Sequence, residues 1–485
     1  MKIIILGAGR VGESVAEHLV SERNDITVID NDPSLLHNLQ ERFDLRCIEG
    51  DGSTPSTLAE AGAADADLLL ACASHDAVNL TACKVAAQRF NIPLRLARLR
   101  TQEWLNNSDQ LLGDTGFAVS HTICPEMSVT RYIQKLVEYP EALQVRNFSG
   151  GMAALVSSRV EAGSPMAGRC VGDYPQVLPD APMAVMAIYR RFSNEADRFI
   201  PCHSDSTIFP GDEIFFAVAQ DAISQVLHTV HAPLPAVRRV MIAGGGNVGT
   251  HLAHTLQSHT QVKILDRSRE RCEFLATHLH DSVLVLHGDS TDEDLLTDEN
   301  IDEVDLFVAA THDDEDNIMA ALLAKKLGAT RVLALVNRRT YADLMHGTQI
   351  DIALSPSQAM MGELLTHVRQ GDVVSVHSVR RGSAEAIELV AHGDRRTSRV
   401  VGRTVGQLEL PEDTRIGLIV RGLPDAHTGL ADADSTFNAE DYAPFVLAAT
   451  NDTVVQSGDH VILFVPHRRM VPAVEKLFRV KATFF

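Results

Sequence analysis

The feature that most constrains the fold of this chain is an internal repeat, in which the second half restates the pattern of the first. Each copy opens with an apolar run, a glycine-rich turn and an amphipathic helical pattern. Later segments match in the same order, so a chance similarity between two generic α/β segments is a poor explanation. The matched pairs are 2–12 with 240–249, 26–30 with 262–266, 50–53 with 288–291, 67–71 with 305–309 and 94–98 with 332–336.

Within each copy, apolar strand-like runs alternate with helical patterns, which predicts βαβ units on a parallel sheet. The runs are apolar almost without interruption, as expected for strands that are covered on both faces. We therefore predict the α/β fold class, with two Rossmann-like, doubly wound parallel-sheet domains.

A second pattern follows each of these domains. A proline opens a helical stretch at 125–137 and again at 356–368, and a turn later leads into an apolar strand at 210–218 and at 457–465. Each Rossmann-like domain is thus expected to be followed by a small α+β lobe. The stretch 423–442 has no counterpart in the first half and is predicted to be a surface loop. The predicted domains are 1–122, 123–232, 236–354 and 355–485.

Composition narrows the functions that such a fold can serve. The chain has 485 residues, which at about 150 residues per domain suggests three or four units. Its formal net charge is −21. This charge argues against bulk binding to nucleic acid, which needs a positive surface, and against unaided adhesion to anionic lipid. A role at a membrane would therefore require a protein partner.

The distribution of apolar residues and cysteines predicts a cytoplasmic protein. The apolar run at 1–6 is too short for the core of a signal peptide, and no apolar stretch approaches the length of a bilayer span. The seven cysteines include no C-x-x-C pair, which argues against a disulfide framework and against a zinc site. We interpret Cys72 and Cys83 as small core residues.

A glycine-rich turn separates the first strand from the first helix in each copy. Its G-x-G-x-x-G spacing is typical of dinucleotide-binding turns: the first glycine permits a tight turn, the second admits a phosphate, and the third lets helix and strand pack closely. Amides at the helix N-terminus then face the pyrophosphate. The turns comprise Gly7, Ala8, Gly9, Arg10, Val11 and Gly12 in the first half, and Gly244, Gly245, Gly246, Asn247, Val248 and Gly249 in the second.

A carboxylate ends the second strand of each copy, at Asp30 and Asp266, close to the expected separation of about 20 residues from the turn. An acid there accepts hydrogen bonds from ribose hydroxyls and repels a 2′-phosphate, which favours NAD(H), ATP or ADP over NADP. A helix-capping or surface aspartate is the alternative. Asp51 and Asp289 follow the third strands, where they either meet an adenine base or cap a Gly-Asp turn.

Further candidates lie where the fourth and fifth strands end, at the crevice in which a nicotinamide or phosphate would lie. Arg98 ends the fifth strand and can pair with phosphate, whereas its counterpart Val336 cannot. The two sites are therefore predicted to be chemically unlike. The candidates that follow the fourth strands are Ala73 and Ser74 in the first half, and Thr311 and His312 in the second.

These motifs resemble the RCK (or KTN) family of nucleotide-binding domains that regulate potassium transport. The resemblance rests on the turn at 7–12, on Asp30, on the segment 50–53 and on the acidic cluster 314–317. Two such domains in one chain, each followed by an RCK-C lobe, resemble the cytoplasmic subunits of bacterial Trk potassium uptake systems. The resemblance covers nearly the whole chain, and the tandem arrangement is its specific part.

The resemblance implies a regulatory protein that binds NAD(H), and also ATP or ADP. It implies a homo-oligomer, a tetrameric ring of eight RCK domains, on the cytoplasmic face of the inner membrane. Its partner would be a potassium-conducting membrane subunit of the TrkH or TrkG type. The first half departs from the family pattern Thr-x-x-Asp-Glu-x-Asn at Ala73 and Ala77, so only backbone contacts are expected there. The implied contacts are 7–11, Asp30, Ala73, Ser74 and Arg98 in the first site, and 244–248, Asp266, Thr311 and His312 in the second.

Other classes of function remain open at this stage. An NAD-dependent oxidoreductase would need an acid–base residue near the nicotinamide, and the two small lobes show no such constellation. A ligand-gated antiporter regulator of related domain type is usually fused to membrane spans. His251 and His254 have the helical spacing of a metal pair, although exposed histidines on a polar helix face are the simpler interpretation. We predict neither catalytic nor metal-binding residues.

Overall fold

The computed structural model describes residues 1–20, 24–192, 197–338, 341, 349–369, 373–379, 383–423 and 443–480. It divides into two compact units, each assembled from both halves of the chain. The first unit comprises Met1–Arg131 and Arg238–Leu364, and the second comprises Tyr132–Val237 and Leu365–Phe485. The predicted surface loop at 423–442 lies outside the described residues apart from Leu423. The four domain boundaries stay predictions.

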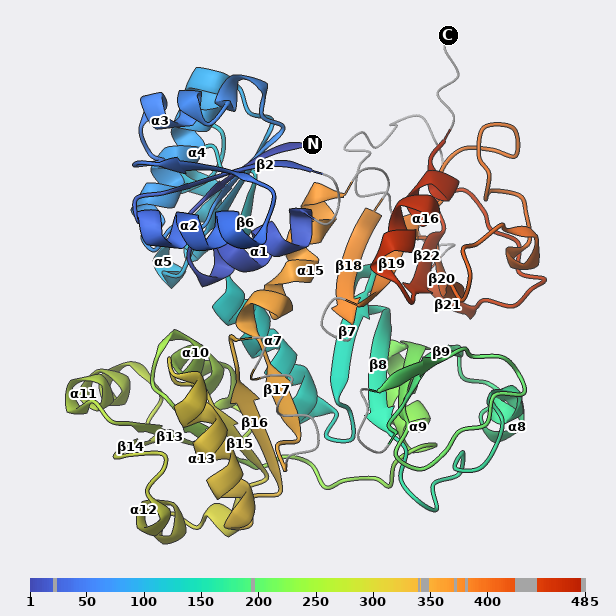
Figure 1. Ribbon diagram of the computed structural model, residues 1–485. Helices are drawn as coiled ribbons and strands as arrows, with labels where there is room; N and C mark the ends of the chain where they lie inside the picture. Colours follow the sequence, from blue (N-terminus) through green and yellow to red (C-terminus); the bar gives the residue numbers. More distant parts are fainter. Residues whose placement is uncertain are drawn as a thin grey trace. The chain divides into compact units, whose positions relative to one another are not determined.

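The first unit holds two six-stranded sheets with the same topology (Figure 1). Their strand orders are β3-β2-β1-β4-β5-β6 and β14-β13-β12-β15-β16-β17, and the paired strands are parallel. This is the doubly wound order, so the prediction of two Rossmann-like sheets is confirmed. The strands are β1 (Lys2–Leu6), β2 (Asp25–Asp30), β3 (Arg46–Glu49), β4 (Leu68–Ala71), β5 (Leu94–Arg98), β6 (His121–Ile123), β12 (Arg239–Ala243), β13 (Gln261–Asp266), β14 (Leu284–His287), β15 (Leu306–Ala309), β16 (Arg331–Leu335) and β17 (Ile352–Leu354).

Continuous apolar runs explain why β4 and β15 lie at the centres of the sheets. Every residue of both strands is buried, which requires helices on both faces. The short edge strands β6 and β17 were not expected from the sequence. The helices are α1 (Arg10–Val20), α2 (Pro33–Arg42), α3 (Pro55–Glu60), α4 (Asp76–Phe90), α5 (Gln102–Asn106), α6 (Ser108–Leu111), α7 (Pro125–Glu138), α10 (Asn247–Leu256), α11 (Arg269–His278), α12 (Glu293–Asp298), α13 (Asp314–Lys326) and α15 (Pro356–Val368).

The second unit holds two five-stranded antiparallel sheets with orders β10-β9-β11-β8-β7 and β18-β19-β22-β20-β21. If the first order is reversed, to β7-β8-β11-β9-β10, its strands follow the same chain order as those of the second sheet. The internal repeat therefore extends to the lobes. The strands are β7 (Gln144–Phe148), β8 (Ala153–Arg159), β9 (Met183–Arg190), β10 (Arg198–Ile200), β11 (Glu213–Ala219), β18 (Val373–Val379), β19 (Ala384–Val390), β20 (Arg415–Arg421), β21 (Phe445–Ala448) and β22 (His460–Val465). The short helices are α8 (Tyr174–Val177), α9 (Ile223–Leu227) and α16 (Val471–Phe478).

The two antiparallel sheets share one hydrophobic core. Phe215 of β11 and Phe464 of β22 are fully buried in it, with ring centroids 6.4 Å apart. Gly417 of β20 permits this approach, because a Cβ there would lie 2.3 Å from the Met186 sulfur. The lobes therefore form a single folded body, in which the buried face of one sheet packs against the buried face of the other.

A buried ion pair stabilises this second unit, and breaking it should lower the free energy of unfolding. Arg369 donates two hydrogen bonds to the Glu385 carboxylate, at 2.9 and 2.8 Å, and the two side chains are 4% and 1% exposed. We expect Glu385→Gln to lower the free energy of unfolding by about 3 kcal/mol, because the buried guanidinium would lose the charge of one carboxylate partner and keep Glu475, at 3.2 Å. Urea unfolding followed by circular dichroism measures this loss. Glu273→Gln, which breaks the exposed Arg269 pair, is the matched control and should change little.

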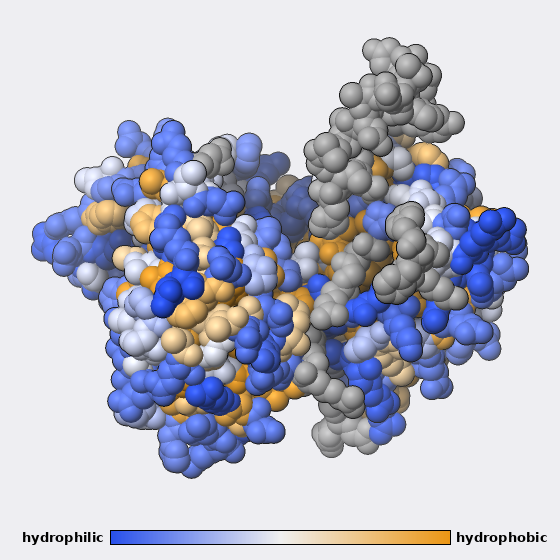
Figure 2. Space-filling view, turned by 90° about the horizontal axis from the view of Figure 1, so that it is seen from above, coloured by the Kyte–Doolittle hydropathy of each residue, from blue (hydrophilic) through white to orange (hydrophobic). Residues whose placement is uncertain are grey.

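Hydrophilic side chains cover much of the described surface in Figure 2, and apolar side chains gather in smaller patches between them. This distribution agrees with the net charge of −21. Within the described ranges, we find no helix whose length and apolar character would let it cross a bilayer.

Candidate functional site

The glycine turn of the first half has the geometry that its spacing predicts. Gly7 has a φ of +102°, and a Cβ there would lie 2.9 Å from the backbone of Cys72 and Ala73. A Cβ on Gly12 would lie 1.8 Å from the Gly7 carbonyl oxygen, so helix α1 packs directly on the turn. A Cβ on Gly9 would meet nothing within 4 Å. The middle glycine thus faces open space, where a phosphate can approach the backbone.

The turn of the second half repeats this geometry with one difference. Gly244 has a φ of +111°, and a Cβ on Gly249 would lie 1.9 Å from the Gly244 oxygen. A Cβ on Gly246 would again meet nothing within 4 Å. Gly245, however, stands where the first half has Ala8, and a Cβ there would lie 2.5 Å from Leu275. The second turn is therefore packed more tightly against its own domain.

The two strand-end aspartates hold their turns in place. In the first half, the amide of Ala8 donates to Asp30 Oδ2 at 2.6 Å and the amide of Asp32 donates to Oδ1 at 2.9 Å. Asp266 accepts in the same way from the amides of Gly245 and Ser268, at 2.7 and 2.8 Å. Each carboxylate oxygen has a second lone pair that can accept from a ribose hydroxyl. Neither aspartate caps a helix with its side chain in this arrangement.

Asp51 and Asp289 both form Asx turns, but their surroundings differ. Asp51 accepts from the amide and hydroxyl of Ser53, which lowers its pKa. Asp289 accepts equivalently from Thr291 and in addition from the Arg267 guanidinium at 2.8 Å; this ion pair is the main cause of its lowered pKa. Neither is a helix N-cap, since Thr54 and Asp292 take that position before α3 and α12.

A fully buried asparagine shapes the crevice in each half. Asn79 Oδ1 accepts from the Ala73 amide at 2.8 Å, and Nδ2 donates to the carbonyls of Ala73 and Arg98 at 3.1 and 2.9 Å. Asn317 makes the matching bonds to Thr311 and Leu335, and also accepts from the Thr311 hydroxyl at 2.7 Å. These side chains tie the end of the fourth strand to the end of the fifth.

The fifth strands show that one predicted match was wrong by one residue. β5 (94–98) corresponds to β16 (331–335), because Leu94 pairs with Leu68 and Arg331 pairs with Leu306 in the two sheets. The counterpart of Arg98 is therefore Leu335 and not Val336. The segment between the buried asparagine and the strand is one residue shorter in the second half, which the sequence match did not take into account. Leu335 cannot pair with a phosphate either, so the predicted difference between the two sites at this position remains.

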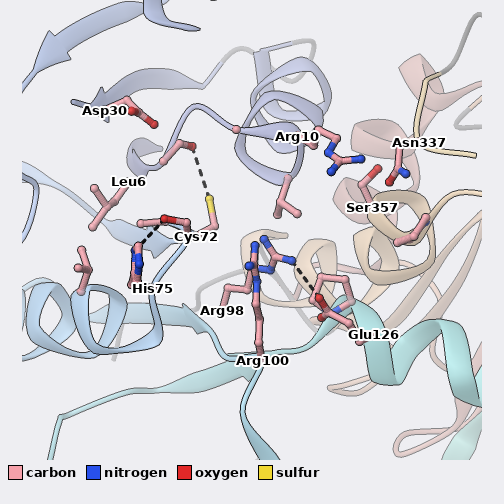
Figure 3. A pocket seen from close by; sticks show the side chains of 18 of the residues that line it. Leu6, Arg10, Asp30, Cys72, His75, Arg98, Arg100, Glu126, Asn337 and Ser357 are labelled. Atoms are coloured by element: carbon pink, nitrogen blue, oxygen red, sulfur yellow. Dashed lines mark hydrogen bonds and ion pairs between the residues drawn. The ribbon is translucent and has the colours of Figure 1, made fainter. Parts of the chain in front are cut away.

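Three arginines of the first half, Arg10, Arg98 and Arg100, bring positive charge to the crevice (Figure 3). The Arg98 guanidinium pairs with Glu126 Oε1 at 3.1 Å, and both side chains are only 12% exposed. Within the described part of the chain, Nε of Arg98 and Nε of Arg100 are buried and lack a hydrogen-bond partner. Burial, reinforced by the neighbouring Arg98, lowers the pKa of Arg100. An anionic group would satisfy these unpaired donors.

The two turns line one cavity of about 730 Å³ within the first unit. The first half contributes its turn, the ends of its strands and the start of α7, and the second half contributes its turn, the ends of β15 and β16 and the start of α15. The predicted residues that line the cavity are Gly7, Gly9, Arg10, Val11, Asp30, Asp51, Ala73, Ser74, Arg98, Gly246, Asn247, Val248, Thr311 and His312. The predicted residues that do not line it are Ala8, Gly12, Gly244, Gly245, Gly249, Asp266 and Asp289.

Several lining residues were not anticipated from the sequence. Arg100 and Glu126 belong to segments that look like an ordinary strand exit and helix start, although their charges next to apolar runs were a usable signal. Leu35 of α2 was indistinguishable from a core residue. Asn337 and Ser357 enter from the second half, and no pattern in one half predicts a contact with the other.

The histidine and cysteine side chains of the chain are potential metal ligands. No group of three or more His, Cys, Asp or Glu side chains there could hold a metal ion. His254 is exposed, while His251 is half-buried and its pKa is lowered by burial. Cys72 lines the cavity, but burial raises its pKa to about 12, which leaves the thiol protonated.

Fold and cavity together define a class of protein: a tandem Rossmann-type chain with the phosphate-binding turn of dinucleotide-binding domains in each half. The family model described as "TrkA-N domain" matches residues 3–116 and 240–356. A Trk system potassium uptake protein TrkA of Halomonas elongata is 45% identical over 100% of both chains. The protein of the same name from Vibrio alginolyticus is 43% identical, again over 100% of both. The chain belongs to this TrkA family.

Solved structures agree with this assignment at the level of the fold. The crystal structure of the GsuK RCK domain has a TM-score of 0.59 at 16% identity, covering 98% of this chain and 94% of that one. The GsuK channel bound to NAD also has a TM-score of 0.59 at 16% identity, covering 98% of this chain and 78% of that one. The relatives are named as potassium uptake proteins, which places the chain with transport-system regulators and not with enzymes.

Proposed function

We propose that this chain is the nucleotide-sensing regulatory subunit of a Trk-type potassium uptake system. Adenine nucleotides, NAD(H) and ATP or ADP, occupy two unlike Rossmann sites and thereby control potassium conduction. The conducting partner is a membrane subunit of the TrkH or TrkG type, and the chain acts on its cytoplasmic face as a tetrameric ring of eight RCK domains.

The observation that carries the proposal is the cavity in the first unit. It combines an open middle glycine, a strand-end carboxylate and two arginines with unpaired Nε atoms. These are the parts that a ribose and a phosphate require: an acceptor for the sugar hydroxyls and donors for the anion. Among the described residues, buried Nε donors that lack a partner next to an open glycine turn are best explained by an anionic ligand.

The proposed contacts follow from this arrangement. In the first site, Gly7, Ala8, Gly9, Arg10, Val11 and Gly12 form the phosphate turn, Asp30 and Asp51 face the adenosine end, and Ala73, Ser74 and Arg98 face the phosphates. In the second site, the same roles fall to Gly244, Gly245, Gly246, Asn247, Val248 and Gly249, to Asp266 and Asp289, and to Thr311 and His312.

Two comparisons support the proposal. The relatives that align along the whole chain are named for potassium uptake, and a channel with the same fold has been solved bound to NAD. The mechanism is thermodynamic linkage. A nucleotide shifts conduction only by binding one shape of the protein more tightly than another, and two unlike sites allow two ligands to act in opposite directions.

Discrimination against a 2′-phosphate is a direct test of the adenosine end. Asp30, Asp32 and Asp51 all line this end of the cavity, so an added phosphate there would meet like charge. We expect NADPH to bind at least about tenfold more weakly than NADH, since an uncompensated repulsion of about 1.4 kcal/mol corresponds to a factor of ten. Calorimetric titration of the purified chain with NADH, NADPH, ATP and ADP measures the difference. Equal affinity for NADH and NADPH would contradict this reading.

The regulatory role has its own experiment. The chain is combined with its membrane subunit in vesicles, and potassium flux is recorded with and without each nucleotide. A flux that depends on the nucleotide supports the proposal. Failure of every adenine nucleotide to bind, or oxidation of NADH when alcohols and acids are supplied, would overturn it.

A further inference from the structure

The adenosine end of the first-half site is open, and its counterpart in the second half is occupied by the protein itself. The difference between the two halves lies at four positions. These positions are equivalent because they lie at the same distance along the chain from features that both halves share: the strand-end aspartate, the Gly-Asp turn and the buried asparagine. All four first-half residues line the cavity, and none of their second-half counterparts does. The pairs are Asn31 with Arg267, Leu35 with Arg271, Asp51 with Asp289 and Val78 with Asp316.

Arg267 makes the decisive contacts. One guanidinium nitrogen donates to Asp289 Oδ1 at 2.8 Å and the other to Asp316 Oδ2 at 2.7 Å. Asp289 follows β14 and Asp316 lies in the first turn of α13, which follows β15. Because β13 and β12 lie between β14 and β15 in the sheet, the guanidinium spans the edge over which an adenosine would lie.

Arg271 occupies the adenosine end of the second site on the side next to the glycine turn. Its Nε donates to the Gly245 carbonyl oxygen, and a terminal nitrogen donates to the Thr250 hydroxyl at 2.9 Å. The first half has apolar Leu35 at this position, which leaves the turn free and offers a surface for a base. The Cγ of Arg271 would also lie 3.4 Å from a Cβ added to Gly245, so this side chain contacts the turn in addition to Leu275.

We propose that Arg267, held by Asp289 and Asp316, is a latch over the adenosine end of the second site, so that nucleotide fills the first site before the second. The inference rests on the proposed function, because a latch matters only where an adenine nucleotide binds. A nucleotide enters the second site after both ion pairs break. Arg267, Asp289 and Asp316 are 51%, 44% and 35% exposed, so each pair is weak, and together they reduce affinity by about tenfold.

Calorimetry with ADP tests the latch in the full-length chain. Arg267→Asn gives the second half the residue that the first half has at Asn31, and it should strengthen the weaker binding step about tenfold while leaving the tighter step unchanged. If the wild-type chain shows a single step of one ADP per chain, the variant should bind two. Arg269→Asn removes a neighbouring exposed arginine that pairs along α11 with Glu273, and it should change neither step.

The Asp30→Ala background makes the second site easier to observe, because it weakens the tighter step by about 10- to 100-fold. There, Arg267→Asn should again raise affinity about tenfold. The latch is overturned if wild-type chains bind two ADP with equal affinity, or if Arg267→Asn leaves the second step unchanged or weakens it, since Arg267 would then be neutral or a ligand contact. Absence of binding of ADP, ATP and NADH alike to the wild-type chain would instead refute the proposed function itself. Melting temperatures within a few degrees of wild type show that each variant is folded.

Discussion

Replacing Asn79 by alanine is expected to lower the free energy of unfolding of the first half by about 3 kcal/mol. Asn79 is fully buried, and its amide satisfies the Ala73 amide and the carbonyls of Ala73 and Arg98. Each buried polar group that loses its partner costs about 1–3 kcal/mol, and water near the cavity recovers part of the loss. The total exceeds the effect of most single substitutions.

The chain has a single tryptophan, which lies in the first half, so its fluorescence reports the loss of stability in that half. Trp104 packs on Phe117, with ring centroids 5.7 Å apart, against the core of the first Rossmann domain. Its fluorescence during urea unfolding should therefore shift to lower urea in Asn79→Ala. Asn38→Ala, on the exposed face of α2, is the matched control and should leave the transition in place. An unchanged transition in Asn79→Ala would contradict the role assigned to its hydrogen bonds.

Replacing Asp30 by alanine should weaken nucleotide binding at the first site by about 10- to 100-fold. A hydrogen bond from a ribose hydroxyl to a carboxylate is worth about 1.5–3 kcal/mol, which corresponds to that range. The substitution also releases the amides of Ala8 and Asp32 that the carboxylate now holds, so the turn loses its fixed geometry. Loss of the ribose hydrogen bond and loss of the fixed turn geometry both lower the affinity for the nucleotide.

Asp25→Ala separates these effects from a simple change of charge. Asp25 is exposed and begins the strand that Asp30 ends, so its removal alters the net charge equally at the opposite edge of the sheet. Calorimetric titration with NADH and ADP should show normal affinity in Asp25→Ala and a weakened tighter step in Asp30→Ala. Equal affinities in the two variants would exclude Asp30 as a ligand contact.

The sequence was sufficient to predict the parts of the fold that depend on local patterns. The βαβ order, the glycine turns and the strand-end aspartates all arise from residues within one short segment, and the six-stranded sheets confirm the expected class. The edge strands β6 and β17 were missed because they have only three residues each. Three residues carry no detectable periodicity, and pairing with a neighbouring strand is what makes them extended.

The candidate site was predictable only where one segment determines it. Gly9, Asp30 and Arg98 were identified because strand ends and turns meet at the same edge of a parallel sheet. Asp289 looked equivalent to Asp51, yet Arg267 holds it in an ion pair that depends on a third residue from another helix, Asp316. Contacts between distant segments of this kind arise from tertiary packing, and no sequence window contains them.

The fusion of both copies in one polypeptide has a consequence for how such a protein can diversify. In a symmetric dimer of identical chains, every substitution appears twice, so the two binding places must stay alike. Here the exchange of Asn31 for Arg267, and of Arg98 for Leu335, affects one place and spares the other. Covalent linkage thus allows the two copies to acquire different affinities, so that each can respond to its own range of ligand concentration.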